Sequence, residues 1–194
     1  VTIDYQFWNN STDYGIAQIK FGDGTIWDRA TIAANAWVRG TSGNDTMTLP
    51  SNGVTVDAGL GNDYMSVSGT GADTIIFAKG DGHDTINNPG SGYVRSDVLY
   101  LVDSVVSDVG LVRSGDLMTV DWTIGSDQIT INYQFWGDKV SQGVGTIQFS
   151  DGTLWDRTDI AQHAWIVGGS GNNIQTGSAD IEAAHGPITG LVNA

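Results

Sequence analysis

The chain of 194 residues has a formal net charge of −14, and all of its acidic residues except Glu182 are aspartates. This charge argues against nucleic acids and anionic membranes as partners, because both are bound through Lys/Arg patches. The chain has no cysteine, which excludes disulfides and thiolate metal sites, and no apolar run reaches the roughly 18 residues that a membrane span needs. The 27 glycines and the preference for Asp over Glu predict a turn-rich β protein.

Residues 1–39 are predicted to form a partial module of strands, a hairpin and a helix. Residues 1–7 and 16–21 alternate apolar and polar side chains, as half-buried strands do. Asp23-Gly24 is a strong turn signal, and it leads into a further short strand at residues 25–27. The second strand and this third one are therefore expected to pair as a hairpin.

A short helix is expected after the hairpin, with Asp28 as its N-cap and Gly40 at its end. The apolar face of this helix is predicted to contain Ile32, Ala33, Ala36 and Trp37. Trp27 and Trp37 are therefore expected in the core, where the hairpin and the helix would pack together.

A glycine–aspartate motif occurs four times within residues 40–97. The four copies are Gly40-Thr41-Ser42-Gly43-Asn44-Asp45, Ala58-Gly59-Leu60-Gly61-Asn62-Asp63, Ser68-Gly69-Thr70-Gly71-Ala72-Asp73 and Lys79-Gly80-Asp81-Gly82-His83-Asp84. Two residues after each final Asp comes an apolar side chain, namely Met47, Met65, Ile75 and Ile86. This pattern is the nonapeptide G-G-x-G-x-D-x-U-x, which is typical of calcium-binding parallel β-helices.

The spacing of the motifs points to a calcium site between stacked loops. Two nonapeptides complete one coil, and Asp45 and Asp63 are 18 residues apart (63 minus 45), so their loops stack on the same side. Ca²⁺ takes six to eight oxygen ligands from carboxylates and carbonyls, and glycines let a turn bring its carbonyls toward an ion. The predicted ligands lie on both loops: Gly40, Ser42, Asn44, Asp45, Ala58, Leu60, Asn62 and Asp63.

Further calcium sites are predicted with less regular spacing. Asp84 lies 21 residues beyond Asp63 (84 minus 63), so a site that includes Asp81 and Asp84 requires a small insertion in the coil. Asp73 is expected to pair with Asp97, which requires a longer bulge. In the last loop of the chain Asn173 replaces the aspartate, and weak or no binding is expected there.

The second half of the chain repeats the first. Residues 1–46 align without gaps on residues 129–174, an offset of 128 (133 minus 5). Asp156 is therefore a second N-cap, with Trp155 and Trp165 expected in the core and Trp8 and Trp136 at the surface. Further strands are predicted at residues 97–103, 110–113 and 116–124. The repeat favours the hypothesis that the chain is part of a tandem array and begins part-way through a module.

The sequence thus predicts an all-β fold. A short parallel β-roll over residues 40–97 is flanked by antiparallel β modules at 1–39 and 98–167, each with one short helix. Residues 168–194 are expected to be the degenerate start of another roll, followed by a tail.

The four loops resemble the haemolysin-type (RTX) calcium-binding repeats of secreted bacterial proteins. Residues 77–86 look like the closing repeat of such arrays, and residues 97–160 are similar to the β-rich domain that caps them. The resemblance implies a parallel β-roll that is disordered without Ca²⁺, export through a type I channel, and folding outside the cell. It covers most of residues 1–173.

Two functions are compatible with these features. The first is a calcium-folded structural, adhesive or secretion-assisting unit that contacts neighbouring repeat modules of a longer parent chain. The second is a calcium-dependent module that binds extracellular glycans, which the seven tryptophans favour. Catalysis is not expected, because no nucleophile motif lies near His83, His163 or His185, although the chain can be an appendage of a secreted enzyme.

Overall fold

The computed structural model describes residues 15–50, 53–90, 96–122, 125–138 and 141–166. In this part of the chain short strands predominate, with two short α-helices, so the all-β class is confirmed. The strand predicted at residues 1–7, the side chain of Trp8, the Asn173 loop and the degenerate roll after residue 168 lie outside the described residues.

The first described elements are a hairpin and a helix. They are β1 (Gln18–Lys20), β2 (Ile26–Asp28) and α1 (Arg29–Asn35). The two strands pair antiparallel, and Gly24 at the turn has a φ of 90°, a conformation that favours glycine. Asp28 accepts a hydrogen bond from the backbone N–H of Thr31 at 2.8 Å. The predicted turn and N-cap are therefore confirmed.

The predicted end of the helix is wrong. The helix stops at Asn35, and residues Trp37–Arg39 form strand β3 instead of a last helical turn. This strand pairs in parallel with β5, so that Trp37 lies opposite Thr55. A contact between residues distant in sequence therefore determines the structure here, and the local helical pattern does not.

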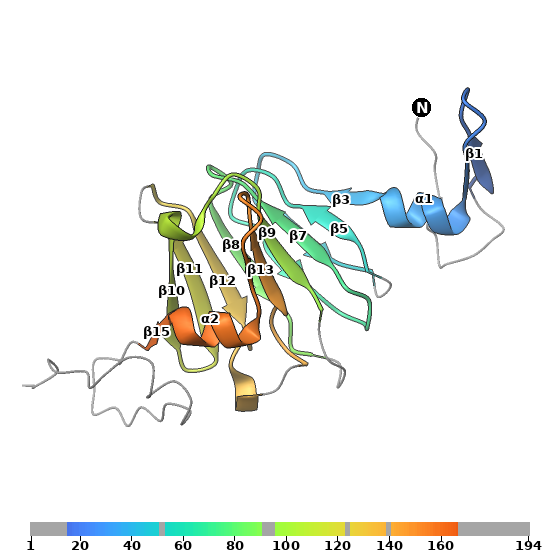
Figure 1. Ribbon diagram of the computed structural model, residues 1–194. Helices are drawn as coiled ribbons and strands as arrows, with labels where there is room; N and C mark the ends of the chain where they lie inside the picture. The colour runs from blue at the N-terminus through green and yellow to red at the C-terminus, as the bar shows by residue number, and fades with distance from the viewer. Residues whose placement is uncertain (1–14, 51–52, 91–95, 123–124, 139–140, 167–194) are drawn as a thin grey trace, which may run out of the picture.

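Residues 37–101 form a coil of short strands that alternate between two sheets (Figure 1). After β3 these strands are β4 (Thr46–Thr48), β5 (Thr55–Asp57), β6 (Tyr64–Ser66), β7 (Thr74–Phe77), β8 (His83–Asn87) and β9 (Val98–Leu101). Each strand pairs in parallel with the next but one: β3 with β5, β5 with β7 and β7 with β9 in one sheet, β4 with β6 and β6 with β8 in the other. Loops two strands apart therefore stack on each other.

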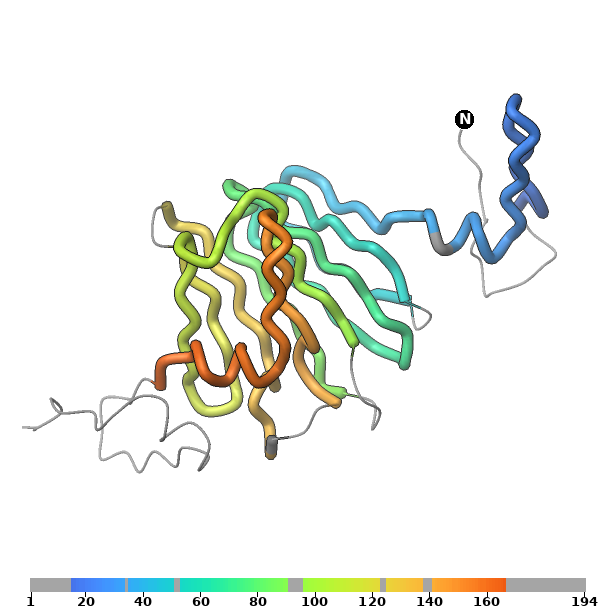
Figure 2. Tube along the Cα trace, viewed as in Figure 1, coloured from blue at the N-terminus to red at the C-terminus, as the bar shows by residue number. Residues whose placement is uncertain are grey.

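The following module continues both sheets, as the tube in Figure 2 shows. Its elements are η2 (Val106–Asp108), β10 (Val109–Ser114), β11 (Leu117–Trp122), β12 (Gln128–Asn132), η3 (Trp136–Asp138), β13 (Thr146–Phe149), β14 (Leu154–Trp155), α2 (Arg157–His163) and β15 (Ala164–Ile166). The pairs β10–β11, β11–β12 and β13–β14 are antiparallel, as predicted for this module. However, β12 pairs in parallel with β8, and β13 pairs in parallel with β9.

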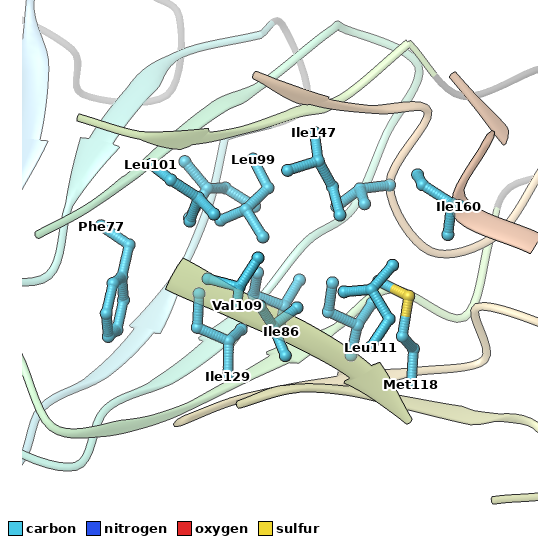
Figure 3. Packing of buried hydrophobic residues seen from close by; sticks show 14 of the residues in the cluster. Phe77, Ile86, Leu99, Leu101, Val109, Leu111, Met118, Ile129, Ile147 and Ile160 are labelled. Atoms are coloured by element: carbon cyan, nitrogen blue, oxygen red, sulfur yellow. The ribbon is translucent and has the colours of Figure 1, made fainter. Parts of the chain in front are cut away.

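The core lies between the two sheets (Figure 3). Of the four apolar residues that follow the motifs, Met65, Ile75 and Ile86 are fully buried and Met47 is half-buried; Val56 of β5 is fully buried with them. The same core continues into the second module through residues such as Leu111, Ile129 and Phe149. Coil and second module therefore share one hydrophobic core.

The predicted core tryptophans divide into two groups. Trp155 is buried against Phe149, and Trp27 is half-buried against Phe21. The prediction is wrong for Trp37 and Trp165, whose exposed fractions are 46% and 70%. Both follow a helix and lie on a short strand, where successive side chains point to opposite faces. Trp136 is exposed, as predicted, but lies in η3 and not on a strand.

The hairpins of the two modules offer a matched pair of substitutions. Phe149 is fully buried, whereas the equivalent Phe21 is 39% exposed. We expect Phe149→Ala to lower the free energy of unfolding by about 3–5 kcal/mol, and Phe21→Ala by about 1 kcal/mol. Urea denaturation of the two variants measures the difference. Equal losses would contradict the burial seen in this fold.

Candidate metal centre

The stacked glycine–aspartate loops lie so close together that only glycine fits at several positions. Gly59 has a φ of 88°, and a Cβ at this position would collide with the backbone oxygen of Thr41. Gly61 has a φ of 130°, and its Cβ would lie 2.8 Å from the backbone oxygen of Gly43. The glycines thus admit neighbouring carbonyl oxygens into the space between loops, as the sequence pattern predicts.

The motif aspartates form a row that crosses the stacked loops. The backbone N–H of Asp45 donates to Oδ1 of Asp63 at 2.7 Å, and the N–H of Asp63 donates to Oδ1 of Asp84 at 2.9 Å. Asp45 itself accepts through Oδ2 from the N–H and the hydroxyl of Thr41. The 21-residue step therefore places Asp84 on Asp63 in the same way as the 18-residue step places Asp63 on Asp45.

A second row of polar side chains runs beside the aspartates. The backbone N–H of Asn62 donates to Oδ1 of Asn44 at 2.9 Å, and the N–H of His83 donates to Oδ1 of Asn62 at 3.1 Å. These two asparagines were both predicted site residues. Their side-chain oxygens hold adjacent loops in register.

Asp63 carries a buried oxygen with no hydrogen bond. Its side chain is 2% exposed, and Oδ2 has no hydrogen-bond partner among the described residues. Burial, followed by the negative charge of Asp45, raises the pKa of Asp63. The ion pairs between described residues, Arg39–Asp57 and Lys79–Asp108, do not involve it. A buried carboxylate in this situation is costly unless a cation neutralises it.

Asp84 is buried beside other carboxylates. Burial, with the nearby charges of Asp63, Asp81 and Asp127, raises the pKa of Asp84 to about 7. Burial also raises the pKa of Asp81, whose Oδ2 accepts from the N–H of Ala78 at 2.7 Å. The end of the aspartate row therefore concentrates negative charge in a poorly solvated place.

The predicted pair Asp73 and Asp97 is brought together, but its surroundings differ. The N–H of Asp73 donates to Oδ1 of Asp97 at 2.8 Å. The other oxygen of Asp97 accepts from the amide of Asn88 at 2.8 Å, and the charge of Asp97 acts on the half-buried Arg157. Asn88 and Arg157 thus interact with the carboxylate of Asp97, and we interpret the pair Asp73–Asp97 as structural.

One carboxylate of this region was not among the predicted site residues. Asp127 precedes β12 and accepts through Oδ2 from the N–H of Gly80 at 2.8 Å. Its signal in the sequence is Gly125-Ser126-Asp127-Gln128-Ile129, which keeps the glycine, the aspartate and the apolar residue of the motif. The parallel pairing of β12 with β8 stacks this loop on the fourth motif.

The donor set fits a hard cation. Among the described residues no three histidine or acidic side chains converge on a point that could hold a metal. A ligand shell at Asp45, Asp63 and Asp84 would therefore need backbone carbonyls beside one or two carboxylates. Calcium accepts such mixed oxygen shells, whereas zinc favours nitrogen and sulfur ligands. The unpaired oxygen of Asp63 and the crowded loop carbonyls match calcium.

Comparison with known families supports this interpretation. Residues 1–31 and 124–159 match the family described as haemolysin-type calcium binding protein related domain. The two matched segments are parts of the two copies of the 128-residue repeat, and they flank the glycine–aspartate loops. A search among curated proteins finds no match, and none of the helices among the described residues is long and apolar enough to span a membrane.

The raised pKa of Asp84 predicts an unusual pH dependence without calcium. Its pKa is 3.8 when unperturbed and about 7 in the folded protein, so the folded state binds more protons between these values. The free energy of unfolding should therefore fall as pH rises from about 4 to about 7, on the order of a few kcal/mol. Denaturation in EDTA across this window measures the effect.

Asp84→Asn is the matched control, because an amide keeps the oxygen that accepts from Asp63 and cannot titrate. The pH slope should be smaller in this variant. An equal slope in both proteins would assign the effect to other groups.

Proposed function

We propose that this haemolysin-type chain is a calcium-binding repeat module of a secreted bacterial protein, which folds when it binds Ca²⁺ outside the cell. The observation that carries the proposal is the buried, unpaired oxygen of Asp63 at the centre of the stacked loops. In this proposal Asp63 and Asp45 supply carboxylate oxygens, and Thr41, Gly43 and the Ala58–Gly61 loop supply carbonyls.

Charge provides the thermodynamic reason for folding with calcium. The chain carries a net charge of −14, and Asp81 and Asp84 are buried near Asp127, so the folded state without a cation repels itself. Where a site exists only in the folded protein, the binding free energy of the metal becomes folding free energy. Extracellular calcium modules commonly bind at about 10⁻⁴–10⁻³ M, and would therefore fill after export.

The module's role in the parent protein is proposed to be structural or adhesive. The shared core and the parallel pairs β12–β8 and β13–β9 support this role, because they make coil and second module one stiff unit. We do not propose a catalytic role for this module. His83 is exposed within the fourth motif, and His163 stacks on Trp155 with its Nδ1 2.7 Å from the backbone oxygen of Asp159.

Asp63→Asn tests the calcium site. The amide keeps an oxygen that accepts from the N–H of Asp45, but it removes the charge that attracts the ion. We expect calcium to raise the melting temperature of the unmodified protein strongly and that of Asp63→Asn much less. Without calcium the variant should be at least as stable as the unmodified protein, because one buried charge is absent. Calorimetric titration should show at least about tenfold weaker binding.

Asp23→Asn is the matched control, since Asp23 caps an exposed hairpin turn by accepting from the N–H of Thr25. Its response to calcium should equal that of the unmodified protein. Calcium binding unchanged by Asp63→Asn would contradict the site, and a circular dichroism spectrum unchanged by EDTA would contradict folding on calcium.

A glycan-binding role is a second candidate, supported by a surface pocket. The pocket has a volume of about 360 Å³ and is lined by Asp116, Leu117, Asn132, Tyr133 and Trp136. Tyr133 adopts a φ of 65°, which is rare outside glycine, and its ring lies 5.6 Å from that of Trp136. An exposed aromatic surface beside amide and carboxylate groups suits the apolar face and the hydroxyls of a sugar ring.

Trp136→Ala tests the glycan proposal. If the pocket binds glycans, the unmodified protein should retain specific glycans on an array in calcium, and the variant should lose at least about tenfold in affinity. Trp165→Ala is the control, because Trp165 is more exposed but does not line the pocket. Absence of glycan binding by the unmodified protein leaves the structural role.

A further inference from the structure

The two copies of the repeat build the same hairpin. The rings of Phe21 and Trp27 lie 5.0 Å apart, and those of Phe149 and Trp155 lie 4.9 Å apart. The N–H of each phenylalanine donates at 2.9 Å to the threonine four residues later. A capped helix of seven residues follows in both copies. The local structure is therefore a property of the repeated sequence itself.

The copies differ in what covers them. Phe149 is fully buried, whereas Phe21 is 39% exposed. Ile147 is fully buried, whereas its equivalent Ile19 is only half-buried. We call the surface of the first copy formed by Ile19, Phe21, Trp27 and Ala36 the hairpin–helix face. It carries the same apolar residues as the second copy, but most of them remain in contact with solvent.

The cover of the second copy comes from the segment that precedes it. Strand β9 pairs in parallel with β13, so that Leu101 lies opposite Phe149. Strand β10 pairs in parallel with β15, so that Leu111 lies opposite Ala164. Between these strands, the backbone oxygen of Ser104 accepts from the N–H of Ser150 at 3.0 Å.

Among the described residues no equivalent cover lies on the first copy. Within the described part of the chain β1 pairs with β2 alone, and Figure 1 shows this hairpin and α1 projecting from the two sheets. The hairpin–helix face has the same apolar residues as a surface that is buried in the second copy. We therefore expect it to pack against strands like β9 and β10, which cover that second surface.

We propose that the hairpin–helix face is a docking surface for a second copy of residues 97–128, located directly before residue 1 as residues 97–128 are located directly before residue 129. In this arrangement the second β9 pairs with β1 and covers Phe21. The second β10 lies beside β3, as β10 lies beside β15. The occupant is a pair of apolar strands of the same chemistry, and not an unrelated protein.

The position of β3 supports the same arrangement. Strands β3 and β15 are equivalent in the repeat, and each is the terminal strand of its sheet. The first pairs with β5, and the second pairs with β10. Because a strand has two edges, a copy within an array can pair with both at once. The sheets of successive repeats would then be continuous, and no exposed edge would remain at the junction.

The test is a chain that carries an additional copy of residues 97–128 joined to residue 1, compared with the present chain in calcium-containing buffer. Hydrogen exchange followed by mass spectrometry reports amide protection in residues 18–36 and 146–163. We expect the extension to raise the protection of residues 18–36 at least about tenfold, toward that of residues 146–163. Phe21→Ala should lower the melting temperature more in the extended chain than in the present one.

The matched control is the same extension with Leu101→Asp and Leu111→Asp in the added copy alone, which should give no protection. The protection of residues 146–163 shows in every case that the rest of the chain is folded. The proposal is overturned if the intact extension leaves residues 18–36 unprotected, or if the Asp-substituted extension protects them equally. It is also overturned if the present chain already protects these residues by forming a dimer, which sedimentation would detect.

Discussion

The structure depends on one constraint, the burial of aspartates that have no basic partner in the described part of the chain. Asp63 and Asp84 lie between stacked loops because the motif places a carboxylate beneath the backbone N–H of the loop before it. This hydrogen bond fixes the register of the coil, but it satisfies only one oxygen of each carboxylate. The register that aligns the apolar residues therefore also gathers negative charge, and a bound cation would neutralise this charge.

Asp97, on the other side of the coil, shows how a buried carboxylate is accommodated by neighbouring side chains. Asp97 occupies the position of a motif aspartate, and its Oδ1 accepts from the N–H of Asp73 in the usual way. Asn88 donates to its remaining oxygen, and Arg157 lies within range of its charge. Side chains of the protein thus contact Asp97, whereas the second oxygen of Asp63 has no hydrogen bond among the described residues. Similar motifs therefore have different roles: the pair with Asp97 is structural, whereas Asp63 and Asp84 belong to the proposed cation site.

Much of the site follows from the sequence because the determining contacts are periodic. The 18-residue step predicts that Asp63 stacks on Asp45, and local turn chemistry predicts the caps Asp28 and Asp156. Other features depend on distant partners. Trp37 continues the apolar pattern of a helix but lies on a strand because it pairs with residues of β5. Asp127 lies beside the fourth motif because β12 pairs with β8 with Ile129 opposite Asp84, and it accepts from the N–H of Gly80, 47 residues earlier.

The same pairing connects the calcium loops to the rest of the molecule. Asp127 holds the fourth motif through Gly80, and Asp103 accepts from the N–H of Lys79 in the same loop. Both aspartates belong to the second module, and their charges contribute to the raised pKa of Asp81. A cation bound near Asp84 would relieve repulsion between the coil and this module as well as within the coil. Calcium binding and docking of the second module onto the coil are therefore expected to be one cooperative step.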